Sequence, residues 1–264
     1  MRTQKPLPVL LFSCFVATTA MAEETATPWS QADAYNDPQE MAKARRAVLK
    51  EHGAGTTYYV LADRFEVQTG EGDPALMLEG QAWWGGDRNK LALKTETEYS
   101  FEEDKFEEAE FQALWSRAIS RYFDFQAGMR HDFSPDPSRT YAALGVQGLA
   151  PYWFEVDAAL FVSNKGDVSA RLEAEYELML TQRLILQPSA EADISFQTVA
   201  PLESGEGLSS IELGARLRYE IKREFAPYIG VHWTRDLGET ADFARANGED
   251  PSIVSFVAGV RLWF

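Results

Sequence analysis

The chain has 264 residues, of which 45% are apolar, and a formal net charge of −16. This length suits one large β domain or two small domains, and so acidic a balance excludes nucleic acid as a partner. The only cysteine, Cys14, lies in an N-terminal segment that we expect to be removed on export. We therefore expect neither a disulfide nor a thiolate metal site in the mature chain.

Residues 1–22 have the pattern of a secretory signal peptide. Basic residues precede an apolar run, and Ala20-Met21-Ala22 is a suitable cleavage site. After it, the polar segment 23–56 predicts a flexible periplasmic lead-in that contains a short helix. Asp37 is a suitable N-cap for this helix, and Pro38 suits its first position. Beyond the signal peptide, no apolar run is long enough for a membrane-spanning helix.

Residues 57–264 are predicted to form an all-β domain, a closed antiparallel transmembrane β-barrel of about twelve strands. Apolar and polar residues alternate here in one segment after another, which is the period of strands whose two faces meet different surroundings. The predicted strands are 58–67, 75–84, 90–99, 107–118, 122–133, 140–148, 152–163, 168–180, 183–196, 209–221, 225–235 and 253–264. Every odd-numbered connector between them is longer than the next, as in outer-membrane barrels with long outer loops and short periplasmic turns.

The predicted location is the outer membrane of a Gram-negative cell. The last residues alternate and stop on the aromatic Phe264, which resembles the C-terminal signal of bacterial outer-membrane proteins. A sheet in lipid must close, because lipid cannot pair the backbone of a free edge. Pro188 and Pro227 each remove a ladder donor, so we expect a bulge or a rim position at each. A secreted soluble β-sandwich or barrel is the alternative.

The polar faces of the predicted strands together carry many acids and several arginines, and we expect these faces to line the lumen. An Arg or Lys facing lipid at mid-bilayer costs about 2–4 kcal/mol, which fixes the register. The arginines expected inside are Arg64, Arg130, Arg171, Arg216, Arg218 and Arg261. Ion pairs that fill the lumen and a selective ion path are the two interpretations of these charges.

Several sequence runs resemble the copper resistance protein B family. They are 81–91, 138–143, 145–155, 170–176, 180–184, 223–228 and 240–245. The resemblance covers about residues 40 to 264. It implies an outer-membrane β-barrel that works with periplasmic copper proteins, including a multicopper oxidase, in copper tolerance. Members commonly carry Met- and His-rich repeats ahead of the barrel that are taken to bind copper, whereas residues 23–56 contain only Met41 and His52.

Candidate copper ligands are therefore sought in the barrel. Copper(I) favours thioethers and thiolates, and copper(II) favours imidazoles. By strand parity Met129 and His131 point outward, whereas Met77, Met179 and His232 point inward. We single out His232 and Met77 as candidate metal ligands, with packing in the lumen as the alternative role of each.

The expected function is copper binding or handling in copper homeostasis at the outer membrane. A narrow general pore without a metal function, and a structural or adhesive protein acting through its outer loops, are the alternatives. We do not expect an enzyme, and we assign no catalytic or cofactor-binding residue. His131 beside Asp132 lies on the wrong face for a lumenal Ser-His-acid site, and His232 has no serine partner that the sequence indicates.

Overall fold

The computed structural model describes residues 30–52 and 55–264. The chain divides into two compact units, Met1–Ala54 and Gly55–Phe264. The described part of the first unit holds the 3-10 helix η1 (Ser30–Ala34) and helix α1 (Pro38–His52). The backbone N–H of Gln39 donates to Asp37 Oδ1 at 2.7 Å, which confirms the predicted cap. The predicted signal peptide lies outside the described residues.

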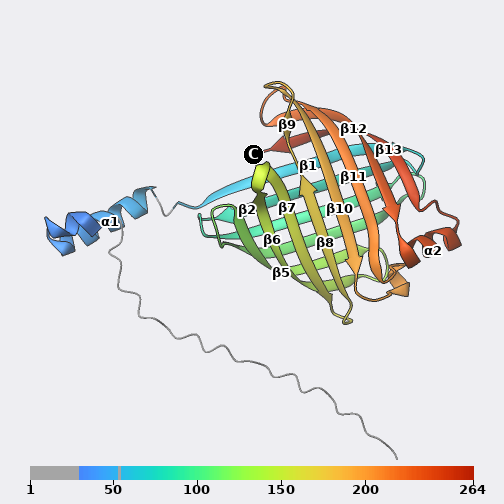
Figure 1. Cartoon of the computed structure of the whole chain (residues 1–264), viewed down its shortest axis with the longest axis horizontal. Coiled ribbons are helices and arrows are strands. Elements are labelled where there is room, and N and C mark those ends of the chain that lie inside the picture. The colour runs from blue at the N-terminus through green and yellow to red at the C-terminus, as the bar shows by residue number, and fades with distance from the viewer. Residues whose placement is uncertain (1–29, 53–54) are drawn as a thin grey trace, which may run out of the picture. The chain divides into compact units, whose positions relative to one another are not determined.

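The second unit is a closed antiparallel barrel (Figure 1). Its strands are β1 (Thr57–Gly70), β2 (Ala75–Gly85), β3 (Asn89–Ser100), β4 (Lys105–Ala118), β5 (Phe123–Ser134), β6 (Arg139–Ala150), β7 (Phe154–Ser163), β8 (Val168–Glu175), β9 (Leu178–Met179), β10 (Leu184–Ser195), β11 (Gly207–Tyr219), β12 (Phe225–Asp236) and β13 (Ser252–Trp263). Strands that follow one another in sequence pair, except that β8 and β9 both pair with β10, and the pairing of β1 with β13 closes the sheet. The twelve-stranded barrel is thus confirmed, with one extra short strand.

Strand β9 arises because the predicted strand 168–180 is interrupted at residues 176–177, so that β8 and β9 pair in turn with β10. Pro188 lies opposite this interruption, where the backbone N–H of Tyr176 donates to its carbonyl at 3.1 Å. The backbone N and O of a strand residue point to the same side. The position where Pro188 lacks an N–H therefore faces the interruption between β8 and β9. Pro227 lies beyond the β11 ladder, which ends at Tyr228, and so has the rim position that we expected.

The distribution of apolar residues is that of a protein in lipid. Leu144, Ile229 and Phe256 are 49%, 65% and 65% exposed, whereas Glu66 and Arg216 inside the barrel are 1% and 3% exposed. Apolar side chains therefore form the outer surface, as strand parity predicted, and the interior holds charged side chains beside an apolar cluster that includes Leu114, Tyr141 and Phe161. None of the described helices combines the length and the apolar character needed to cross a membrane.

Strand β1 departs from strict alternation. Its register against β2 and β13 shifts between Ala62 and Phe65, and this bulge turns two consecutive charged side chains inward. Asp63 pairs with Arg261 at 2.6 Å, and Arg64 pairs with Glu79 at 3.0 Å. The other arginines expected inside, Arg130, Arg171, Arg216 and Arg218, also pair with carboxylates of the lumen.

The two ends of the barrel differ less than expected. We call the end with Thr57 and Trp263 the terminus rim and the opposite end the loop rim. At the loop rim, connector 101–104 has the same length as the connector that follows it at the terminus rim, 119–122. The same holds for 164–167 and 180–183. The predicted alternation of lengths is therefore wrong at these two pairs. Ladder pairing extends strands such as β4 into the predicted loops. The difference in connector length between the two rims comes mainly from the loops 196–206 and 237–251, both at the loop rim. Because outer-membrane barrels have their longer loops outside the cell, the loop rim is the extracellular one.

The longest loop contains helix α2 (Gly238–Asn247). Two short 3-10 turns, η2 (Pro151–Trp153) and η3 (Ala200–Leu202), lie in other connectors of the barrel. The sequence did not predict α2. Contacts with the loop 196–206 stabilise it, because Gly205 N donates to Thr240 Oγ1 and Asn247 Nδ2 donates to Glu203 Oε2, both at 2.9 Å. The two longest loops thus support each other at the loop rim.

We expect the buried pair of Glu66 and Arg216 to be essential for stability. Arg216 Nε and Nη2 contact the two carboxylate oxygens of Glu66 at 2.8 and 2.7 Å. Arg216→Ala leaves that carboxylate buried without its partner, and should lower the free energy of unfolding by about 3–5 kcal/mol. Urea unfolding of the refolded barrel measures this. Arg245→Ala, at the exposed pair with Asp242, is the control and should cost about 1 kcal/mol or less; similar losses in both variants would contradict the prediction.

Candidate functional site

Two rows of carboxylates face the lumen, each formed by residues directly opposite one another on successive strands. The first acidic ladder consists of Glu79, Glu96, Glu110 and Asp132 on β2, β3, β4 and β5. The second acidic ladder consists of Asp157, Glu173, Glu191 and Glu212 on β7, β8, β10 and β11. Like charges directly opposite one another destabilise a sheet. These rows therefore concentrate negative charge at a cost in stability.

Basic side chains neutralise the ladders only in part. Arg64 pairs with Glu79, and Arg130 contacts Glu110 and Asp132 at 2.7 Å each. In the second ladder Lys94 pairs with Asp157, whereas Glu212 faces the imidazole Nε2 of His232 at 3.2 Å. Among the residues that the structure describes, Glu173 has no ion-pair partner. The carboxylates of the ladders outnumber the side chains that pair with them.

Arg171 of β8 connects the two ladders. Its guanidinium lies 2.7 Å from Glu96, 3.5 Å from Glu110 and 3.1 Å from Glu191. It also reaches Glu108 at 3.6 Å and Asp193 at 3.3 Å. The Arg171 side chain is 10% exposed, so these contacts lie largely out of water. One buried cation thus serves five carboxylates from three strands.

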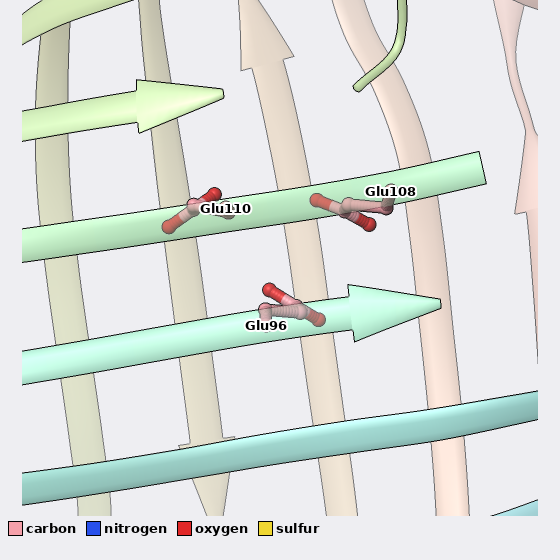
Figure 2. Close-up of side chains that lie close together, drawn as sticks. All are labelled: Glu96, Glu108 and Glu110. Atoms are coloured by element: carbon pink, nitrogen blue, oxygen red, sulfur yellow. The ribbon is translucent and has the colours of Figure 1, made fainter. Parts of the chain in front are cut away.

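Figure 2 shows a compact group of acids within this network. Glu96 lies on β3, and Glu108 and Glu110 lie on the neighbouring β4, with one carboxylate oxygen of each within 4.8 Å of the others. Such spacing could hold a metal ion through oxygen ligands. All three carboxylates, however, already contact the guanidinium of Arg171. We therefore assign this group to the ion-pair network.

Two neighbouring cavities occupy the lumen. The larger, of about 230 Å³, is lined from Glu155 and Arg261 near the terminus rim to Glu96 and Arg171 deeper in the barrel. The smaller, of about 50 Å³, is lined by His232 and by carboxylates of the second ladder. The two cavities share Glu79, Glu173 and Glu175 in their linings. In both linings the carboxylates outnumber the basic side chains.

Of the two predicted metal ligands, His232 lies at the end of the second acidic ladder. Its Nε2 is 3.2 Å from Glu212 Oε2 and 3.0 Å from Thr234 Oγ1. Its Nδ1 is buried without a hydrogen-bond partner among the described residues. A carboxylate beside Nε2 favours the tautomer that carries its proton there, which leaves the Nδ1 lone pair available.

Met77 lies elsewhere in the barrel. It is 6% exposed and stands opposite Glu66 and Glu98 on the neighbouring strands. Its strand β2 is three strand steps from β12, which carries His232. At the usual spacing between neighbouring strands, this is about 14 Å along the sheet. The structure does not bring the two candidates together. Met179 lies in β9 near the terminus rim and is 72% exposed.

Sequence reasoning missed the acidic ladders as such. Strand parity placed most of these acids inside, but their alignment depends on the register between strands, which parity does not fix. One signal was available in the sequence: an acid lies at least three residues inside each of five predicted strands, at Glu96, Glu110, Glu173, Glu191 and Glu212.

Repulsion in the second ladder can be tested at Glu173, which lies between Asp157 and Glu191. Glu173→Gln removes one like charge without breaking a described ion pair, so the free energy of unfolding at pH 7 should rise by up to about 1 kcal/mol. Urea unfolding of the refolded barrel measures the change. In the control Glu191→Gln the loss of the 3.1 Å contact with Arg171 should cancel any gain. An unchanged or lower free energy of unfolding in Glu173→Gln would contradict the prediction.

Comparison with known proteins identifies the family. The family model "Copper resistance protein B precursor (CopB)" matches residues 56–264. Copper resistance protein B of Escherichia coli is 46% identical over 213 residues, 81% of this chain and 71% of the relative. The homolog from Pseudomonas syringae pv. tomato is 44% identical and covers 81% of this chain and 72% of the relative.

Solved structures share the barrel architecture. The NanC porin superposes with a TM-score of 0.50 at 12% identity, over 78% of this chain and 99% of the porin. The KdgM porin gives a TM-score of 0.47 at 10% identity, over 79% and 99%. The closed barrel with its apolar exterior is that of an outer-membrane protein, and the family model and the two relatives show that the chain belongs to the copper resistance protein B family.

Proposed function

We propose that this outer-membrane copper resistance protein binds copper(II) in its lumen, with His232 as the central ligand. The observation that carries the proposal is the buried Nδ1 of His232, which has no hydrogen-bond partner among the described residues, beside a cavity lined with carboxylates. An imidazole nitrogen with carboxylate oxygens suits copper(II), whereas copper(I) prefers sulfur. Met77, the only buried thioether in the described barrel, lines neither lumen cavity.

Glu212 supports His232 as a positioning residue. Metal-binding histidines commonly donate their second N–H to a carboxylate, which orients the ring and makes the ligand nitrogen more basic. Glu212 Oε2 stands 3.2 Å from Nε2 of His232 and fits this role. Glu79, Glu173, Glu175 and Glu191 line the same cavity and are the nearby oxygen donors.

The acidic ladders account for how a dilute cation would reach this site. A surface or cleft with an excess of one charge raises the local concentration of ions of the opposite charge. The larger cavity begins near the terminus rim, which is the periplasmic end of an outer-membrane barrel. Copper would therefore be exchanged on the periplasmic side, and a periplasmic copper protein such as a multicopper oxidase is the partner class that we propose.

The main alternative is a narrow general pore without a metal function. The acidic lumen agrees with both hypotheses, since it attracts any cation. What favours copper is the unpaired imidazole nitrogen, for which a general pore has no use. Copper binding by the purified protein separates the two.

Copper(II) titration of the refolded barrel, followed by electron paramagnetic resonance, tests the site. We expect about one ion per barrel with nitrogen coupling, and a loss of affinity of about tenfold or more in both His232→Asn and Glu212→Gln. His131→Asn changes a histidine whose Nδ1 faces Thr140 at 2.8 Å on the outer side of the barrel, and should bind as the wild type does, as should Met77→Leu. A stoichiometry near zero, or full affinity in His232→Asn, would overturn the proposal.

A further inference from the structure

We propose that the lumen is a cation-selective ion path that Arg171 holds closed. This inference concerns the passage of small cations such as K⁺ along the barrel. It does not require copper to bind at His232, so the two proposals can fail separately. Three observations carry it: contacts that cross the lumen, the excess of carboxylates around them, and the position of Arg171 at the inner end of the larger cavity.

The contacts of Arg171 span the barrel. Around the ring the strand order is β1 to β8, then β10 to β13. Arg171 on β8 thus stands four and five strands from its partners on β4 and β3, close to the opposite wall of a twelve-stranded ring. A guanidinium bound to opposite walls obstructs the space between them.

Three other contacts span four strands of the ring. Arg261 of β13 pairs with Glu177, between β8 and β9, at 2.6 Å, and the other two contacts are simpler. Lys94 of β3 pairs with Asp157 of β7, and Gln147 Nε2 of β6 donates to Gln81 Oε1 of β2 at 3.4 Å. Each joins one side chain to one partner. Arg171 joins five carboxylates, so it is the group whose removal changes the lumen most.

The surrounding charges set the selectivity of the path. Rings of Asp and Glu favour cations in channels. Without Arg171, the carboxylates of Glu96, Glu108, Glu191 and Asp193 lose a shared cation, while Glu110 keeps its pair with Arg130 at 2.7 Å. The lumen would then be both wider and more negative at the point where it is now closed.

Planar-bilayer recording of the refolded barrel in KCl with a metal chelator tests the proposal. We expect a small conductance for the wild type and a severalfold larger one for Arg171→Ala, with a reversal potential under a KCl gradient that shows selectivity for K⁺. The control is Arg139→Ala, which removes a buried arginine that pairs at 3.0 Å with Asp167 in the connector after the neighbouring strand β7. This variant should conduct as the wild type does.

A second variant covers the possibility that Arg171→Ala does not fold. This second variant combines Glu96→Gln and Glu110→Gln. It keeps Arg171 but removes the charges of two carboxylates that bind it from the opposite wall. We expect a conductance above that of the wild type with weaker selectivity for K⁺ than in Arg171→Ala. The heat-dependent shift in electrophoretic mobility of folded barrels identifies the folded samples. Wild-type conductance in the folded variants, a wild type that already conducts as Arg171→Ala does, or anion selectivity would each overturn the inference.

Discussion

Lipid can neither pair a backbone polar group nor solvate a charge, and this constraint determines the architecture of the barrel. The sheet must close, which it does where β1 pairs with β13 and β10 with β11. Closure leaves one place for charged side chains, the lumen, where pairs such as Glu66 with Arg216 are removed from water. The acids that alternate along the membrane-spanning strands therefore give the barrel an acidic interior.

The acidic ladders follow from closure combined with register. A soluble sheet would turn such acids toward water, where repulsion between neighbours is screened. Inside the barrel Glu96 stands directly between Glu79 and Glu110, and Glu191 stands between Glu173 and Glu212. Arg171 offsets part of this repulsion. Natural proteins tolerate such a local conflict chiefly at functional sites, which is why we place the function of the barrel in these rows.

Much of the fold could be predicted because period-two alternation and helix capping are local signals. The alternation identified the strands and the lumenal arginines, and Asp37 with Pro38 located α1. The bulge in β1, the break between β8 and β9, and the ladders depend on partner strands, about which a single strand holds no information. Helix α2 was missed because it depends on contacts with the loop 196–206. Likewise His232 and Met77 share a face by parity, yet their strands lie in different sectors of the ring.

The arrangement of the two cavities separates the capture of a cation from its passage. The larger cavity is lined from the terminus rim to Arg171, whereas the smaller one is lined by His232 and shares Glu79, Glu173 and Glu175 with the larger. On the two proposals, a copper ion from the periplasmic side reaches His232 through shared carboxylates, without displacing Arg171 from the opposite wall. The same acids can thus supply a metal to His232 while the lumen stays closed to small ions. A copper-handling barrel with this geometry would not need to leak.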